Sequence, residues 1–268
     1  MTIANDPILA VAIRAARTAA SIVIDAARDL KRLPTFSKEH GDIVSGADME
    51  AEDAIIATLR AAFPEHAILG EESGHIEGAR ERTGYKWIVD PIDGTANFVH
   101  GFPYYAVSIA LSHGTEITHA VVLDPVHNDL FTAAKGKGAF HNGSQIHVSA
   151  CLNLTAALVS TVFPARESPK LAAYLPTFNA LITQCAGLRR AGSSALDLAH
   201  LAAGRLDGFW VMNLKAWDIA AGALLVEEAG GRVGDFAGGM DFMRANEVIA
   251  ATPGIFNALR EAVVAARQ

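Results

Sequence analysis

Residues 87–98 of the chain read Trp-Ile-Val-Asp-Pro-Ile-Asp-Gly-Thr-Ala-Asn-Phe. The apolar start of this stretch predicts a strand that ends at Asp90. Pro91 has no backbone N–H and a restricted φ angle, so it predicts a turn directly after the strand. The turn leaves Asp90, Asp93 and the carbonyl oxygen of Ile92 free to converge on one cation, because hard divalent cations take oxygen ligands.

The next two residues, Gly94 and Thr95, predict the start of a helix. Backbone N–H groups at a helix N-terminus attract anions, so a phosphate group would fit there. A plainer alternative explains the same residues without any bound ion. In that alternative an aspartate caps the helix and the proline only makes the turn.

Two further acidic motifs accompany the first. Residues 70–74 read Gly-Glu-Glu-Ser-Gly, and residues 217–222 read Trp-Asp-Ile-Ala-Ala-Gly. Glu71 and Glu72 follow an apolar strand, where adjacent carboxylates repel each other unless a cation or a basic group intervenes. Asp218 opens an apolar helix. A solvated acidic turn and a carboxylate that stabilises the helix dipole are the structural alternatives, but the three motifs together favour a metal-assisted reaction on a phosphate.

A fourth segment could face an anion. Residues 190–195 read Arg-Ala-Gly-Ser-Ser-Ala and place Gly192 and Ser193 directly before an expected helix. A glycine turn with a serine N-cap is the alternative interpretation. Glu227 and Glu228 precede Ala-Gly-Gly, which is typical of a helix C-terminus, so no catalytic role is expected for them.

The bulk composition indicates a globular chain. It has 268 residues, of which 51% are hydrophobic and 19% charged, with a formal net charge of −7. We expect one compact unit made of two halves: residues 1–145, an α+β half with most metal ligands, and residues 146–268, an α/β half that completes the active site. No run of Lys or Arg exceeds two residues, so direct nucleic-acid binding is not expected.

The sequence also indicates where in the cell the protein is expected. No basic segment followed by an apolar core opens the N-terminus, and no uncharged stretch is long enough to span a membrane. We therefore expect a soluble, cytoplasmic protein without a membrane span. Cys151 and Cys185 are the only cysteines, which argues against a zinc ribbon or a disulfide scaffold, and both are expected to be buried small apolar residues.

Hydrophobic periodicity predicts layers of helices and sheets. The expected helices are 6–31, 48–62 with Asp48 as N-cap, 168–183, 193–203, 217–229 and 254–266. The expected strands are 67–69, 87–89, 104–112, 117–123, 129–133, 156–162, 187–190, 207–211, 231–235 and 247–251. A loop or a loose hairpin is expected over 35–47.

These motifs resemble those of the inositol monophosphatase family, within the lithium-sensitive, magnesium-dependent phosphatase superfamily. The resemblance covers essentially the whole chain, because 71–73, 90–97, 192–195 and 217–222 come in the family's order and spacing. It implies a layered α+β/α/β fold, the α-β-α-β-α sandwich of the inositol monophosphatase and fructose-1,6-bisphosphatase type. It also implies a protein that is often a homodimer and that hydrolyses phosphate monoesters with two or three Mg²⁺ ions.

The resemblance also implies roles for individual residues. The implied metal ligands are Glu71, Asp90, Asp93, Asp218 and the carbonyl oxygen of Ile92. The implied catalytic residues are Thr95, Asp48, Glu71 and Asp93, with Thr95 and Asp48 together orienting the attacking water. The implied substrate contacts are Gly94, Thr95, Gly192, Ser193 and Asp218. Glu72 would help to orient water at the metal without binding the metal itself.

One position departs from the family pattern. Many members carry a Glu seven residues before the aspartate of the third motif, where it binds substrate hydroxyls, and here that position is Val211. The expected activity is that of an inositol-1(or 4)-monophosphatase-type phosphoric monoester hydrolase acting on inositol 1-phosphate or a related polyol or sugar phosphate. Glycerol 2-phosphate, histidinol phosphate and nucleotide phosphates remain open as substrates. Fructose bisphosphate or 3′-phosphoadenosine 5′-phosphate would need a basic or base-stacking pocket that the sequence does not indicate.

A non-enzymatic alternative also remains open. Some bacterial members of the family are implicated in assembling ribosomal-RNA transcription complexes. The chain would then be a regulatory protein of the transcription-antitermination type, with a partner in the transcription machinery. The acidic balance favours a protein partner over direct RNA binding.

Overall fold

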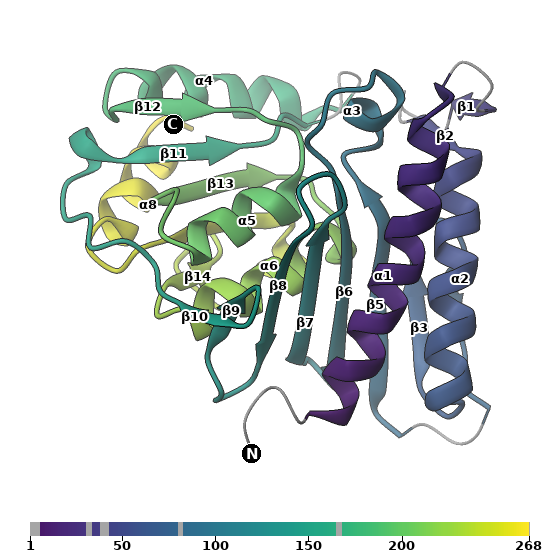
Figure 1. The fold of residues 1–268 in the computed structure, drawn as a ribbon. Helices are drawn as coiled ribbons and strands as arrows, with labels where there is room; N and C mark the ends of the chain where they lie inside the picture. Colours follow the sequence, from purple (N-terminus) through teal and green to yellow (C-terminus); the bar gives the residue numbers. More distant parts are fainter. Residues whose placement is uncertain (1–5, 31–33, 38–42, 80–82, 165–167, 268) are drawn as a thin grey trace.

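The computed structural model describes residues 6–30, 34–37, 43–79, 83–164 and 168–267. Its elements form five layers (Figure 1), in which a helix pair, an eight-stranded sheet, a second helix pair, a five-stranded sheet and a last helix pair follow one another. The expected α-β-α-β-α sandwich is therefore confirmed. Whether the chain divides functionally at residue 145 stays a prediction.

The large sheet has the strand order β10-β9-β8-β7-β6-β5-β3-β4. Neighbours from β5 to β10 are antiparallel, whereas β3 and β5 are parallel. Its strands are β3 (Ala67–Gly70), β4 (Gly74–Ile76), β5 (Tyr85–Asp93), β6 (Ala106–His113), β7 (Glu116–Asp124), β8 (Asp129–Ala134), β9 (Ala139–His141) and β10 (Ser144–Ile146).

The second sheet has the order β12-β11-β13-β15-β14, and β11 pairs in parallel with both of its neighbours. Its strands are β11 (Leu158–Thr161), β12 (Gly187–Arg189), β13 (Gly208–Met212), β14 (Arg232–Gly234) and β15 (Glu247–Ala251). A separate antiparallel pair is formed by β1 (Thr35–Ser37) and β2 (Ile43–Ser45).

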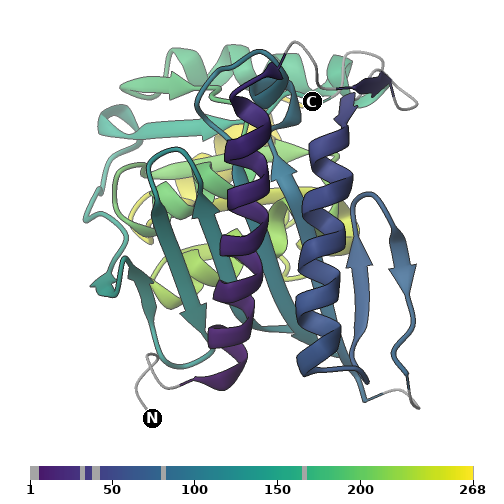
Figure 2. The same cartoon turned by 45° about the vertical axis from the view of Figure 1, so that its right-hand side comes forward.

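The helices cover both sheets and separate them. They are α1 (Pro7–Ala27), α2 (Gly46–Ala62), α3 (Thr95–Val99), α4 (Lys170–Ile182), α5 (Ser194–Ala202), α6 (Ala216–Glu228), α7 (Phe242–Ala245) and α8 (Phe256–Ala265), with a 3₁₀ turn at Leu154–Ala156. Figure 2 shows α1 and α2 side by side on the outer face of the large sheet. Helices α5 and α6 lie between the sheets, and α4 and α8 cover the outer face of the second sheet.

The central layer explains why the two sheets stay together. The middle of α6 is buried all round, as its nearly continuous apolar sequence predicts. A Cβ atom on Gly222 would lie 2.5 Å from the Cβ of Leu198 on α5, so only glycine allows the two helices to approach this closely. This packing holds the N-termini of α5 and α6 against the large sheet, where the candidate site lies.

Helix α1 is long and apolar enough to cross a membrane by length and composition alone, but 44% of that window is buried inside the structure. Its buried face packs on α2 and on β6 and β7, as a core helix of a globular protein does. The helix begins at Pro7 because Asp6 accepts hydrogen bonds from the N–H groups of Ile8 and Leu9. It ends at Ala27, four residues earlier than predicted.

Several local predictions were wrong. Asp48 is not the N-cap of α2; Ser45 is, and Asp48 is the third helical residue. The strand expected over 87–89 continues to Asp93. Strands β9 and β10 and helix α7 were not expected, since three or four residues carry too little periodicity to be recognised.

The region 35–47 contains the pair β1 and β2, although residues 38–42 lie outside the described part of the chain. Both cysteines are free, as expected, but Cys151 and Cys185 are partly exposed rather than buried.

Candidate metal centre and active site

The first acidic motif sits on a bulge in β5. Asp90 pairs with Ser108 and Asp93 with Ala106, and the register shifts between them, so Pro91 and Ile92 on β5 lie opposite the single residue Val107 of β6. Both aspartates are buried, at 1% and 7% exposure. The turn after the strand that Pro91 was expected to cause is therefore a bulge within the strand, and it brings both carboxylates to the same end of the sheet.

Gly94 follows the bulge and begins α3 with a φ angle of 102°. A Cβ atom there would lie 3.1 Å from the carbonyl oxygens of Gly192 and Tyr104. Glycine is thus required both by the backbone conformation and by the close approach of two other segments. The side chain of Asn97 fixes the same junction, because its Nδ2 donates to the carbonyls of Tyr104 and Ala191.

Asp48 and Thr95 lie together, as the resemblance implied. The hydroxyl of Thr95 is 3.0 Å from Asp48 Oδ1 and 3.0 Å from the carbonyl oxygen of Ile92. The other oxygen of Asp48 accepts the N–H of Ser45 at 2.8 Å and its hydroxyl at 2.5 Å. Asp48 is fully buried, so helix α2 holds one carboxylate oxygen rigidly and presents the other to Thr95.

The N-terminus of α5 closes the site from the second sheet's side. Ser193 Oγ donates to Asp93 Oδ2 at 2.5 Å, and the N–H of Ala195 donates to the same oxygen at 2.7 Å. Ser193 is also the N-cap of α5, as the alternative interpretation of this segment had it, and it accepts a hydrogen bond from the N–H of Leu196. The side chain of Ser193 is fully buried and directed at Asp93, whereas Gly192 beside it is partly exposed.

Asp218 completes a group of three carboxylates. It is the third residue of α6, and its Oδ2 accepts the N–H of Lys215 at 2.7 Å. One carboxylate oxygen each from Asp90, Asp93 and Asp218 lie within 4.8 Å of one another. Three carboxylates this close, two of them buried, require a cation or protons for neutralisation.

The negative charge of this cluster is costly without neutralisation. Burial raises the pKa of Asp90 well above its ordinary value, and the negative charge of Glu71 raises it further. Burial also raises the pKa of Asp93 to about 6, against the lowering effect of the hydrogen bonds from Ser193 and Ala195. Oxygen ligands in this arrangement fit Mg²⁺, which prefers carboxylates and carbonyl groups.

The four sequence motifs therefore meet at one end of the large sheet. A model of the inositol monophosphatase family matches residues 4–268 of the chain. The chain belongs to the inositol monophosphatase family.

Relatives and solved structures agree with that assignment. The chain is 48% identical over 258 residues to the Nus factor SuhB of Pseudomonas aeruginosa, and the match covers 94% of each protein. It is similar in structure to the extragenic suppressor protein SuhB from Bartonella henselae, with a TM-score of 0.92 and 40% identity over 96% of this chain and 98% of that one. For the inositol monophosphatase from Anabaena the TM-score is 0.83, with 34% identity over 96% and 95% of the two chains.

Within this family member, Glu71 lies at the end of β3, next to β5. Its N–H donates to the carbonyl of Val89 at 3.1 Å, and its charge acts on Asp90. The N–H groups of the next two residues, Glu72 and Ser73, are bound by Glu52 of α2. Glu52 was not expected at the site, although its position four residues after Asp48 places both carboxylates on one face of the helix.

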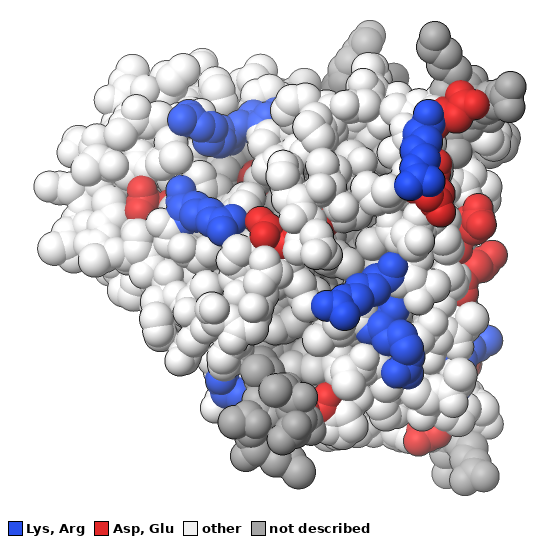
Figure 3. All heavy atoms as spheres, viewed as in Figure 1, with Lys and Arg blue, Asp and Glu red and all other residues white. Residues whose placement is uncertain are grey.

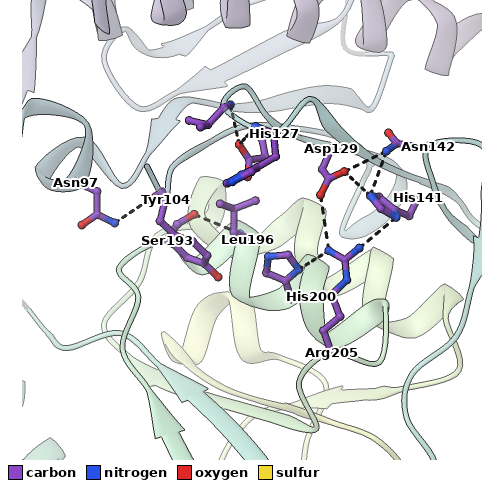
Figure 4. A network of polar contacts seen from close by, with 12 residues as sticks. Asn97, Tyr104, His127, Asp129, His141, Asn142, Ser193, Leu196, His200 and Arg205 are labelled. Carbon is purple, nitrogen blue, oxygen red and sulfur yellow. Dashed lines mark hydrogen bonds and ion pairs between the residues drawn. The ribbon is translucent and has the colours of Figure 1, made fainter. Parts of the chain in front are cut away.

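A pair of residues that the sequence did not indicate connects the segment before β6 to helix α5. The hydroxyl of Tyr104 donates to Asp197 Oδ1 at 2.7 Å, and Asp197 is fully buried. Burial raises the pKa of Asp197 to about 8, so this carboxyl group is mainly protonated at neutral pH. Figure 4 shows Tyr104 bonded to Asn97 and, as a separate group of contacts, Arg205 approaching Asp129 of the large sheet and His200 of α5.

Val211 lies on β13 and is fully buried among apolar side chains between the two sheets. It therefore offers no polar atom to a substrate hydroxyl. The structure brings Asp48 into contact with Thr95, and Asp93 into contact with Ser193. The roles of the predicted site residues in binding and catalysis stay predictions.

Proposed function

We propose that this protein hydrolyses phosphate monoesters in a Mg²⁺-dependent reaction. The observation that supports this most directly is the cluster of Asp90, Asp93 and Asp218, whose oxygens lie within 4.8 Å of one another. Mg²⁺, as two or three ions held by this cluster with Glu71 and the carbonyl of Ile92, would supply Lewis-acid stabilisation of the phosphoryl oxygens and lower the pKa of a bound water.

Residues of the chain orient the attacking water. The Thr95 hydroxyl, 3.0 Å from Asp48 Oδ1, orients the water that attacks phosphorus. Asp48 Oδ1 accepts the hydrogen bond from Thr95, while Asp48 Oδ2 is held by Ser45. Glu72 helps to orient water at the metal from outside the ligand set.

The phosphate is held by N–H donors of the backbone. We assign this role to Gly94 and Thr95, which begin α3. This helix has only five residues, so the local N–H groups contribute more than its small dipole. Gly192 and Ser193 before α5, and Asp218 at the start of α6, form the side of the site that we assign to the leaving group.

The residues on the leaving-group side bear on the substrate class. Inositol 1-phosphate or a related polyol or sugar phosphate is the proposed substrate, with activity of the inositol-1(or 4)-monophosphatase type. Because Val211 is buried and apolar, it cannot hydrogen-bond an inositol hydroxyl. Discrimination between inositol 1-phosphate and simpler esters such as glycerol 2-phosphate should then be weak, since a missing polar contact removes most of the selectivity for a hydroxyl.

Phosphate release from a panel of monoesters tests this proposal. The panel contains inositol 1-phosphate, glycerol 2-phosphate, histidinol phosphate and a nucleotide monophosphate, each with Mg²⁺ and with excess chelator. Chelator-sensitive release that millimolar Li⁺ inhibits is expected. Absence of release from every ester, in a protein that remains folded, would contradict the proposal.

A second function is supported by the relatives. A protein named Nus factor SuhB is 48% identical over 94% of this chain, so we also propose a regulatory role with a partner from the transcription machinery. On the face in Figure 3, basic side chains lie in separate groups with acidic ones between them. The net charge of −7 points the same way, toward a protein partner rather than RNA.

This regulatory role and catalysis are compatible in one protein. We further propose a cytoplasmic homodimer, which equilibrium sedimentation of the purified chain would test. Binding to purified RNA polymerase and antitermination factors tests the regulatory role. Retention of that binding in an Asp93→Asn variant would separate it from catalysis, and failure to bind any of these proteins would contradict it.

A further inference from the structure

Glu52 is a buried carboxylate that is not one of the three clustered aspartates. It lies on α2 with 2% of its surface exposed. Its Oε1 accepts the N–H of Ser73 at 2.7 Å, and its Oε2 accepts the N–H of Glu72 at 3.0 Å. Each carboxylate oxygen thus holds one backbone N–H of the turn that follows Glu71. Hydrogen bonds to an ionised acceptor are about twice as strong as neutral ones, which offsets the cost of burying the charge.

The backbone on the other side of Glu71 is adapted to this contact. A Cβ atom on Gly70 would lie 2.6 Å from both the carboxyl carbon and Oε1 of Glu52. Gly70 therefore leaves the space in which the carboxylate sits. The N–H of Glu71 itself is bound to the carbonyl of Val89 on β5, so three consecutive N–H groups, those of 71, 72 and 73, are all fixed.

Helix α2 consequently serves two separate parts of the site. Asp48 and Glu52 are four residues apart and lie on the same buried face. Asp48 contacts Thr95, which follows β5. Glu52 contacts the turn that follows β3. A rigid helix thereby sets the distance between the proposed water-orienting pair and the turn that carries Glu71.

We infer that Glu52 is a positioning residue that fixes the backbone around Glu71 and so tightens cation binding at the site, an inference that rests on the proposed function. The backbone sets the direction of the Glu71 side chain. If the N–H groups of the turn were unbound, the backbone would not stay in one conformation. Metal ligands need such support, because a side chain that is free to move loses conformational entropy when the ion binds, and this loss weakens binding.

The experiment compares Glu52→Gln with the wild-type protein, using Mg²⁺ alone as the probe. The glutamine keeps one acceptor oxygen but turns an NH₂ group toward a backbone N–H, so the turn loses one of its two contacts. Calorimetry on the metal-free full-length protein should show a dissociation constant for Mg²⁺ raised about tenfold, the size expected from losing one charge-assisted hydrogen bond. At saturating Mg²⁺, phosphate release should return to within about threefold of wild type.

Asp53→Asn is the matched control. Asp53 is the next residue on α2, is exposed, and loses the same charge on substitution. Its Mg²⁺ affinity should equal that of wild type, which separates positioning from a general change in charge. Gly70→Ala provides a second route, since its new methyl group must displace the Glu52 carboxylate. It should weaken Mg²⁺ binding in the same direction, and it carries the test if Glu52→Gln does not fold.

Each outcome has a distinct meaning. Wild-type affinity in folded Glu52→Gln overturns the inference and leaves the proposed function standing. A loss of activity that saturating Mg²⁺ does not restore also overturns it, because Glu52 would then act in the chemical step. Failure of the wild-type protein itself to bind Mg²⁺ overturns the proposed function and the inference with it.

Discussion

Ser193 and Asp93 are one hundred residues apart in the chain, and the hydroxyl of Ser193 donates to Asp93 Oδ2 at 2.5 Å. Ser193 begins a helix of the central layer, while Asp93 ends a strand of the large sheet. The contact therefore joins two parts of the chain that pack together only in the complete fold. It makes the geometry of the metal cluster depend on how α5 docks.

Ser193→Ala should weaken both the helix and the site. The variant loses the N-cap of α5 and one of two donors to Asp93. The free energy of unfolding should fall by about 1 kcal/mol, the usual cost of losing an N-cap, and phosphate release should fall about tenfold if a charge-assisted hydrogen bond at the site is lost. Denaturant unfolding and initial rates measure the two effects. Thr183→Ala, which removes an exposed hydroxyl at the end of α4, is the control and should change neither.

Asp48 and Thr95 should act as one unit. Asp48→Ala and Thr95→Ala each remove the 3.0 Å contact between them, so each should lower the rate by roughly a hundredfold, within the usual range for a group that assists proton transfer. The double variant should be about as slow as the slower single variant, because the second change removes an interaction already lost. Rate losses that multiply in the double variant would show that the two side chains act independently.

Asp197→Asn should change how stability depends on pH. The pKa of Asp197 is raised to about 8, chiefly by burial, with a further rise from the charge of Asp93, while Tyr104, Ser160 and Arg190 lower it. A raised pKa in the folded state contributes stability that is fully present below the unfolded value near 3.8 and is lost as pH rises to about 8.

The wild-type protein should therefore lose up to about 1.4 kcal/mol of unfolding free energy per pH unit through Asp197 across that window. The asparagine variant lacks this term, so its stability relative to wild type should increase from pH 5 to pH 8. It also keeps an acceptor oxygen for the hydroxyl of Tyr104. Urea unfolding at several pH values measures the difference. A constant difference across this range would contradict a neutral Asp197.

Much of the fold could be predicted from the chain because its long elements are strongly periodic. The helical spacing of apolar residues in α1 and the apolar run of α6 predicted two helices, and both are found. Short elements such as β9, β10 and α7 could not be predicted, since their existence depends on pairing or packing with distant segments.

At the site, residue types were predictable but their positions were not. A proline after a strand indicated a turn, yet Pro91 lies within a bulge because β6 continues to pair on both sides of it. Asp48 looked like an N-cap, but Ser45 supplies that cap and Asp48 is turned toward Thr95. Glu52 gave no motif signal at all, since its partners are backbone N–H groups, which every sequence contains.

The most direct test of the central claim is the rate of phosphate release from inositol 1-phosphate and glycerol 2-phosphate as Mg²⁺ is increased, for wild type and Asp93→Asn. The account predicts Mg²⁺-dependent release by the wild type and a loss of roughly a thousandfold or more in the variant, with circular dichroism spectra unchanged. Equal rates in the two proteins, or wild-type release that persists in excess chelator, would contradict it.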